Sequence, residues 1–180
     1  MRLSIVGAGP ISKELYEDFY IRFGIRLLSN YGSTETGAIL SRVEKEPYNS
    51  VGKPMEGVRI KVLDDNKSPV PIGEQGKLWV KSPNMFTGYY GLAEQPIDED
   101  GWFPMHDIVY QNQSGAVFIC GREWRIIKIG GKKVNPKEVE EVILRLPKVK
   151  DCVVMECREK VKAFVAAKGL TSEDIRKECL

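Results

Sequence analysis

Histidine and cysteine are scarce in this sequence, and neither is arranged as a metal site would require. The 180 residues contain one histidine, His106, and four cysteines without a C-x-x-C pair. A local zinc site needs closely spaced Cys and His ligands, and a disulfide scaffold needs a dense cysteine framework, so the sequence favours neither class. This cysteine usage is typical of a reduced intracellular protein.

Long apolar runs and a strong excess of one charge are also missing. No stretch approaches the roughly 20 apolar residues that a membrane span needs, and glycine interrupts the opening MRLSIVGAGP too early for a signal peptide. The 27 basic and 25 acidic side chains leave a net charge of +2, which gives no reason to expect a nucleic-acid partner. We therefore expect a cytoplasmic protein without a membrane span, and the oligomeric state stays open.

Three kinds of pattern follow one another along the chain, and together they predict a mixed α+β fold. Residues 1–50 alternate apolar strands with one amphipathic helix. Residues 51–121 hold short strands separated by Gly- and Pro-rich loops, which favours a barrel-like subdomain or a distorted sheet. Residues 122–180 combine short strands and helices in a compact α+β unit. The predicted domains are thus 1–121, made of an αβ segment (1–50) and a β-rich subdomain (51–121), and 122–180.

Local signals place individual elements within these regions. The first region should hold a buried strand at 3–6, a glycine-rich turn at 7–10, a helix that ends at Gly24, and a strand at 25–28 that runs into Asn30-Tyr31-Gly32. The second should hold strands near 58–62, 78–80 and 117–119. The third should hold a hairpin turn at Gly130-Gly131, a helix capped by Asn135, strands near 151–157 and 161–167, and a helix opened by Thr171.

The segment Asn30-Tyr31-Gly32-Ser33-Thr34-Glu35-Thr36-Gly37 carries the sharpest chemistry. Its aromatic ring suits a purine, its hydroxyls suit a phosphate oxygen, and its carboxylate suits a hard cation such as Mg²⁺. Taken alone, these eight residues are more typical of a polar surface turn with a helix cap than of a nucleotide site.

The segment is not alone, since further blocks follow in the order typical of one family. It resembles the Y-G-S/P-T-E motif of adenylate-forming enzymes, the superfamily of acyl-CoA synthetases, luciferases and peptide-synthetase adenylation domains. Five other blocks resemble family motifs as well: Gly7 to Ser12, Gly73 to Leu78 with Gly88-Tyr89 after it, Asp100 to Asp107, Gly121-Arg122 with the residues up to Gly131, and Asn135 to Glu140. The resemblance covers essentially the whole chain and implies the C-terminal part of an AMP-forming acyl-CoA ligase.

The resemblance implies a role for each matching residue. Tyr31 would pack on adenine, Thr34 would contact the α-phosphate, and Asp107 would accept both ribose hydroxyls. Glu35 would ligate Mg²⁺, so Thr34 and Glu35 are the expected catalytic residues. The full expected nucleotide set is Gly9, Pro10, Asn30, Tyr31, Gly32, Thr34, Asp107 and Arg122, and the expected coenzyme A set is Gly130, Gly131 and Lys132. Lys132 belongs to a basic cluster with Lys128 and Lys133. Such a cluster is more typical of a solvated face than of a contact with coenzyme A phosphates.

The resemblance also implies an activity and two absences. Family enzymes join ATP to a carboxylic acid, here expected to be a fatty acid, and then transfer the acyl group from the adenylate to coenzyme A. Residues 1–121 would be the C-terminal part of the AMP-binding domain, with 1–50 the end of its αβ nucleotide-binding layer, and residues 122–180 part of the small lid domain. The resemblance implies that the family's phosphate-gripping loop would precede residue 1, and nothing in this sequence resembles that loop. It also implies that the family's G-K lysine near the C-terminus would lie beyond Leu180. We therefore expect that this chain alone does not form adenylates.

Some positions depart from the family pattern, and two other functions stay open. Met105-His106 stands where Thr-Gly is usual, and Trp124 and Arg125 stand where charged hinge residues are usual. An adenylation domain that loads a carrier protein and a non-catalytic interaction module derived from such an enzyme are the alternatives. A dinucleotide-binding protein is disfavoured, because the third glycine of G-x-G-x-x-G would be Ser12.

Overall fold

The computed structural model describes residues 3–7, 9 and 11–178, which divide into two compact units, Met1–Ile119 and Cys120–Leu180. Strand β8 (Val117–Arg122) begins in the first unit and ends in the second. Among the described residues, no helix is both long enough and apolar enough to span a membrane.

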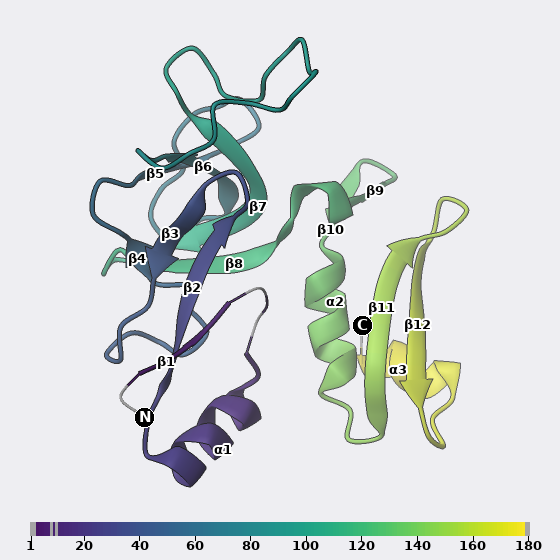
Figure 1. Ribbon diagram of the computed structural model, residues 1–180. Coiled ribbons are helices and arrows are strands. Elements are labelled where there is room, and N and C mark those ends of the chain that lie inside the picture. Colours follow the sequence, from purple (N-terminus) through teal and green to yellow (C-terminus); the bar gives the residue numbers. More distant parts are fainter. Residues whose placement is uncertain (1–2, 8, 10, 179–180) are drawn as a thin grey trace. The chain divides into compact units, whose positions relative to one another are not determined.

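The first unit opens with a four-stranded sheet in the order β1-β2-β3-β4 (Figure 1). Its strands are β1 (Ser4–Val6), β2 (Leu27–Ser33), β3 (Gly37–Ser41) and β4 (Lys53–Pro54). β1 pairs parallel to β2, with Val6 opposite Ser29, and the remaining pairs are antiparallel. The strand predicted at 25–28 therefore continues to Ser33, and β3 and β4 were not predicted.

Helix α1 (Lys13–Phe23) connects β1 to β2, and its ends follow the rules of helix capping. The Ser12 hydroxyl accepts a hydrogen bond from the Leu15 amide (3.1 Å), and Gly24 ends the helix in the left-handed conformation at φ 67°. The prediction that the helix ends at Gly24 is confirmed, because only glycine adopts this conformation without a steric penalty.

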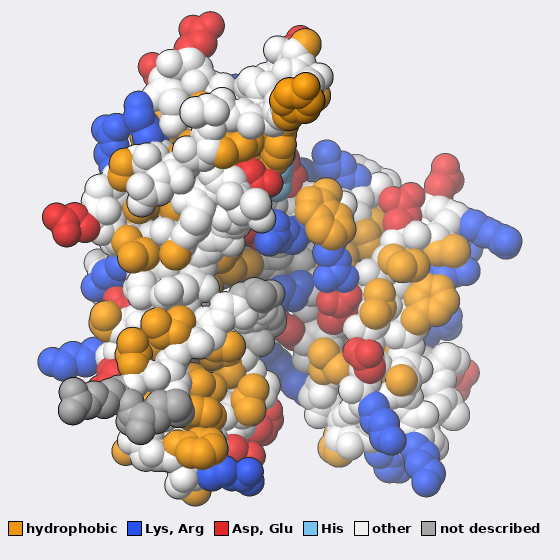
Figure 2. All heavy atoms as spheres, viewed as in Figure 1, with side chains coloured by type: hydrophobic (Ala, Val, Ile, Leu, Met, Phe, Trp, Pro, Cys, Tyr) orange, Lys and Arg blue, Asp and Glu red, His pale blue; other side chains and the backbone are white. Residues whose placement is uncertain are grey.

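The prediction of a buried strand at 3–6 is wrong in one respect, since the outer side of β1 is uncovered. Ile5 is 52% exposed, and several large apolar side chains of α1 are exposed as well. Figure 2 shows orange side chains gathered where Figure 1 draws α1. The exposed apolar residues of β1, the segment before it and α1 are Leu3, Ile5, Leu15, Tyr20, Ile21 and Phe23.

The second sheet of the first unit has the order β5-β6-β7-β8. Its first three strands are β5 (Arg59–Leu63), β6 (Gly76–Lys81) and β7 (Phe103–Gln111), which pair antiparallel. Alternate residues of β6 are buried, as in a sheet with one face on the core. Within the described residues no pairing of β5 with β8 closes the sheet, so of the two predicted forms the structure has the open one.

The second unit is the compact α+β arrangement that the sequence predicts. Its elements are the end of β8, a 3₁₀ turn η1 (Glu123–Arg125), β9 (Ile127–Ile129), β10 (Lys132–Val134), α2 (Pro136–Leu144), β11 (Val149–Glu156), β12 (Val161–Ala167) and α3 (Ser172–Glu178). Asn135 caps α2 by accepting from the Lys137 amide (3.2 Å), with Pro136 in the first turn. Ile127, Ile143, Cys152 and Val154 form its buried core.

Asp174 and Thr171 cap α3 reciprocally. The Thr171 amide and hydroxyl both donate to Asp174 Oδ2 (2.8 Å each), and the Asp174 amide donates to the Thr171 hydroxyl (3.2 Å). Hydrogen bonds from the Thr171 backbone, then from its side chain, hold the pKa of Asp174 below its ordinary value.

We expect α3 to fray in acid. Because the pKa of Asp174 is lowered, its stabilising contribution is complete above the ordinary pKa near 3.8 and is lost as pH falls through the lowered value. Amide hydrogen exchange at Ile175, followed from pH 6 down to about pH 2.5, measures this. Asp174→Asn should remove the pH dependence specific to α3. An unchanged exchange profile in that variant would contradict the capping assignment.

Candidate functional site

The Y-G-S-T-E segment forms the β2–β3 hairpin rather than a strand followed by a loop. The Thr36 amide donates to the Ser33 carbonyl (3.3 Å), and the Ser33 amide donates to the Thr36 hydroxyl (3.1 Å). Thr36 is fully buried and its hydroxyl also donates to the Gly37 carbonyl (3.0 Å). The second threonine thus holds the turn that presents Thr34, which is exposed, and Glu35, which is half-buried.

Gly32 and Asn30 each have a structural role within this hairpin. A Cβ atom at Gly32 would lie 1.8 Å from the Gly37 carbonyl oxygen, so only glycine allows the strands to approach this closely. The Asn30 side chain accepts a hydrogen bond from the Ser41 hydroxyl (2.9 Å). Gly32 and Asn30 were expected as nucleotide contacts, which stays a prediction.

Tyr31 and Asp107 meet inside the first unit although 76 positions separate them. The Tyr31 hydroxyl donates to Asp107 Oδ2, and both residues are buried, Tyr31 within the main apolar core and Asp107 with 1% of its surface exposed. The structure therefore brings together two residues to which the resemblance assigns adenine and ribose. A buried tyrosine–carboxylate pair also orients the carboxylate, because burial makes a lost partner costly.

An irregularity in β7 accompanies Asp107. Lys77 lies opposite Ile108 whereas Trp79 lies opposite Pro104, so β7 carries extra residues at this point. His106 adopts a left-handed backbone conformation there, at φ 57°. This is the geometry of a β-bulge, which re-aims neighbouring side chains. It gives a physical reason why the family pattern usually has glycine where this chain has His106.

We expect His106→Gly to be more stable than His106→Ala. Both changes remove the imidazole, so their difference isolates the left-handed backbone, which costs a residue with a Cβ atom roughly 1 kcal/mol. Urea unfolding midpoints with equal m-values measure this difference. Equal stability of the two variants would show that the bulge carries no such strain.

Glu35 is connected to the loop between β6 and β7. Its Oε1 accepts from the Tyr89 hydroxyl (2.7 Å), and its carbonyl accepts from the Phe86 amide (2.8 Å). Hydrogen bonds from Ser33 and then Tyr89 hold the pKa of Glu35 below its ordinary value, while the bond to Glu35 raises the pKa of Tyr89. Gly88-Tyr89 resembles a family motif, but no role was predicted for Tyr89, because no residue near it in the sequence points to Glu35.

A single carboxylate at this turn is compatible with Mg²⁺ carried by a nucleotide. No group of three or more His, Cys, Asp or Glu side chains that could hold a metal ion occurs in the described part of the chain. Mg²⁺ is commonly held by one or two carboxylates together with substrate phosphates and water. Glu35, half-buried and with its pKa lowered, suits that role.

Gly9 and Pro10 were expected beside the adenine. Gly9 follows β1, whose residue Val6 pairs with Ser29 next to Asn30, and a Cβ at Gly9 would meet nothing within 4 Å. Pro10 lies outside the described residues. Gly9 therefore has open space around it, unlike Gly32.

The remaining predicted residues belong to the second unit. Arg122 is exposed at the end of β8, and Lys132 is exposed at the start of β10. Gly130 and Gly131 form the two-residue turn between β9 and β10, with φ 56° and 75°, as the sequence predicts. The predicted contact of Arg122 with the nucleotide stays a prediction. So does the predicted contact of Gly130, Gly131 and Lys132 with coenzyme A.

Two further features of the second unit lie near Arg122 in sequence. Trp124 on η1 is 74% exposed. Arg125 Nη2 lies 2.6 Å from Glu140 Oε1, an oxygen that also accepts from the Val154 amide (2.8 Å). Arg125, at a family carboxylate position, thus ties η1 to α2, and Glu140 extends the connection to β11.

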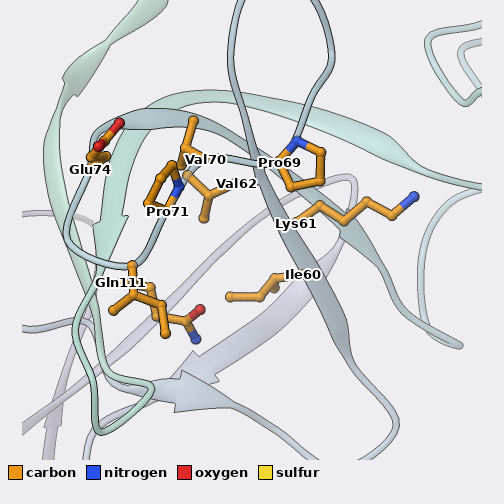
Figure 3. Close-up of a pocket in the computed structure, with 9 residues that line it drawn as sticks. Ile60, Lys61, Val62, Pro69, Val70, Pro71, Glu74 and Gln111 are labelled. Atoms are coloured by element: carbon orange, nitrogen blue, oxygen red, sulfur yellow. The ribbon is translucent and has the colours of Figure 1, made fainter.

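The first unit contains a pocket of about 210 Å³. Figure 3 shows its lining, which comes from β5, the segment 69–74 and the end of β7. None of the predicted site residues contributes to it. Its lining is largely aliphatic and proline side chains, so it offers little chemistry.

Comparison with known proteins agrees with these motifs. The family model described as "AMP-binding enzyme" matches residues 1–90. The medium-chain fatty-acid–CoA ligase of Escherichia coli (strain K12) is 34% identical over 169 residues, which cover 89% of this chain and 30% of that protein. The long-chain-fatty-acid–CoA ligase of Yersinia pestis is 31% identical over 194 residues, covering 99% of this chain and 34% of that protein.

A solved structure agrees at the level of the fold. ATP-bound MatB from Rhodopseudomonas palustris superposes with a TM-score of 0.88 at 28% identity, covering 98% of this chain and 38% of that chain. The sequence thus spans about a third of the length of the two CoA ligases. The family model that matches residues 1–90 shows that the chain belongs to the AMP-binding enzyme family, and the relatives that it resembles include CoA ligases.

Proposed function

We propose that this chain supplies the adenosine-binding part of an AMP-forming acyl-CoA ligase. The complete enzyme would activate a carboxylic acid with ATP and transfer the acyl group from the adenylate to coenzyme A. A fatty acid is the proposed substrate, since relatives are named as medium-chain and long-chain fatty-acid–CoA ligases. The proposed location is the cytoplasm, in keeping with the cysteine usage of the sequence.

The meeting of Tyr31 and Asp107 is the observation that carries this proposal. A hydroxyl from one end of β2 and a carboxylate from a bulged strand converge across 76 positions, and both belong to the predicted nucleotide set. The carboxylate, with two acceptor oxygens, suits a pair of ribose hydroxyls. Tyr31 would border the adenine through the small exposed part of its ring, since 8% of its surface is accessible.

The β2–β3 turn would serve the phosphates. Thr34 is exposed on the turn, where its hydroxyl can donate to the α-phosphate. Glu35 would hold Mg²⁺, which neutralises phosphate charge when bound. The buried Thr36 and the close packing at Gly32 would fix both side chains in place.

The proposal extends to the residues of the predicted set that the second unit exposes. Arg122 would donate to the ribose, and the turn at Gly130-Gly131 would border the coenzyme A arm. Lys132 would attract coenzyme A phosphates. The carrier-protein alternative shares the adenylation step and differs only in the thiol, so it is separated by supplying coenzyme A or a carrier protein to the complete enzyme.

Two measurements on the 180-residue chain test the proposal. AMP should shift the NMR signals of Tyr31, Thr34 and Asp107. ATP–pyrophosphate exchange with a panel of fatty acids should be absent, because the family resemblance places the phosphate-gripping loop and the G-K lysine outside these 180 residues. AMP binding that leaves these signals unmoved would overturn the proposed site. Robust exchange would overturn the expectation that the chain alone is inactive.

A further inference from the structure

Tyr89 reaches Glu35 across 54 positions and contacts the part of Glu35 that matters chemically. Its hydroxyl donates to the carboxylate oxygen Oε1 (2.7 Å). Three residues before Tyr89, the Phe86 amide donates to the Glu35 carbonyl (2.8 Å). The segment between β6 and β7 is therefore joined to the Y-G-S-T-E turn at both its main chain and its side chain.

The Tyr89 ring is itself held in place by aromatic neighbours. It packs edge-on against Phe86, with ring centroids 4.9 Å apart. Phe86 packs edge-on against Phe103 at the start of β7, at 5.4 Å, so the aromatic chain ends in the buried core. Such contacts fix ring orientation as well as position.

The backbone of Tyr89 is fixed by one side chain, Gln95. The Tyr89 amide donates to Gln95 Oε1 (2.6 Å), and Gln95 Nε2 donates to the Tyr89 carbonyl (3.0 Å). Gly88 makes room for this arrangement, since a Cβ there would lie 2.4 Å from Gln95 Oε1. Tyr89 is thus exposed, yet its backbone and its ring are both held by contacts.

We propose that Tyr89 is a positioning residue that holds the Glu35 carboxylate in one orientation for a hard divalent cation carried by the nucleotide. The inference rests on the proposed function, which assigns that cation to Glu35. Mg²⁺ demands near-ideal octahedral geometry, so a ligand that is already oriented loses less freedom on binding. Hydrogen-bond partners of ligating carboxylates commonly set metal affinity in this manner.

Tyr90 provides a matched control beside Tyr89. It has the same side chain and is fully exposed, and among the described residues no hydrogen bond or ring contact is found for it. Tyr89→Phe and Tyr90→Phe each remove one hydroxyl from neighbouring positions, but only the first removes the contact with Glu35. Phenylalanine keeps the ring, so the packing on Phe86 is retained.

The test uses Mn²⁺ as a paramagnetic probe, titrated at fixed ATP into the 180-residue chain. Broadening of the Glu35 and Thr36 amide signals reports the cation, and ATP titrations without metal report nucleotide binding separately. In Tyr89→Phe, about tenfold more Mn²⁺ should be needed to produce the same broadening. Binding of ATP without metal should be unchanged. Tyr90→Phe should match the unmodified chain.

The outcomes separate this inference from the proposed function. Absence of broadening at Glu35 in the unmodified chain would overturn the metal role and the inference together. Broadening in the unmodified chain with an equal response in Tyr89→Phe would overturn the role of Tyr89 alone. Gln95→Ala loosens the segment but keeps the hydroxyl, so an equal loss in that variant would assign the effect to loop order and overturn the role of the hydroxyl.

Discussion

Asp107→Ala should reduce AMP binding by the chain about 100-fold, equivalent to roughly 3 kcal/mol, which places residual binding at the limit of detection. The reason is that a buried carboxylate would accept two hydrogen bonds from ribose, and hydrogen bonds to a charged group are the stronger kind. Asp107 is 1% exposed and oriented by the Tyr31 hydroxyl, so no neighbouring side chain replaces it easily. Isothermal titration or NMR titration with AMP measures the loss.

The controls for this change address the fold. Asp107→Asn keeps an oxygen that accepts from Tyr31 but loses the charge, so it should fold normally and still bind AMP weakly. Tyr31→Phe removes the same internal hydrogen bond and keeps the ring, so it should reduce AMP binding only a few-fold, by about 1 kcal/mol. If folded Asp107→Ala binds AMP as well as the unmodified chain, the ribose role is wrong.

Gly32→Ala should lower the free energy of unfolding of the first unit by about 2–4 kcal/mol, whereas Gly9→Ala should change it by less than about 0.5 kcal/mol. A Cβ at Gly32 would lie 1.8 Å from the Gly37 carbonyl oxygen and 2.9 Å from the Ala38 Cα, so the hairpin must open. A Cβ at Gly9 would meet nothing within 4 Å. Urea unfolding measures both variants.

The Gly32→Ala and Gly9→Ala variants also distinguish two reasons for a glycine in the predicted nucleotide set: packing within the chain and close approach of the ligand. Both glycines were expected to contact the nucleotide, but only Gly32 has a packing reason within the chain itself. A loss of AMP affinity in a stable Gly9→Ala variant would point to close approach by the ligand. Stability of Gly32→Ala equal to that of the unmodified chain would show that the hairpin is not packed as described.

Elements with strong local chemistry were predictable from the sequence. Gly24 at the end of α1 and Asn135 with Pro136 at the start of α2 act through neighbouring residues, so their roles can be read within a few positions. The turn at Gly130-Gly131 is equally local, because both residues need positive φ. Strands β11 and β12 alternate in burial only weakly, yet their apolar runs and flanking turns sufficed.

Features that depend on distant partners were missed. Strand β7 was not predicted, since Pro104 and the bulge at His106 disturb the alternation that marks a strand. The hydrogen bonds from Tyr31 to Asp107 and from Tyr89 to Glu35 join segments 76 and 54 positions apart. The family resemblance assigned a role to Tyr31, Asp107 and Glu35, whereas no signal in the sequence identified Tyr89 as a partner of Glu35.

The exposure of Trp124 gives the second unit an optical reporter of its own. The chain has three tryptophans, and the other two, Trp79 and Trp102, lie in the first unit. Trp102 is 9% exposed whereas Trp124 is 74% exposed, so iodide or acrylamide should quench mainly the red-shifted emission of Trp124. Events around η1 can therefore be followed by fluorescence without attaching a dye, with Trp124→Phe as the blank.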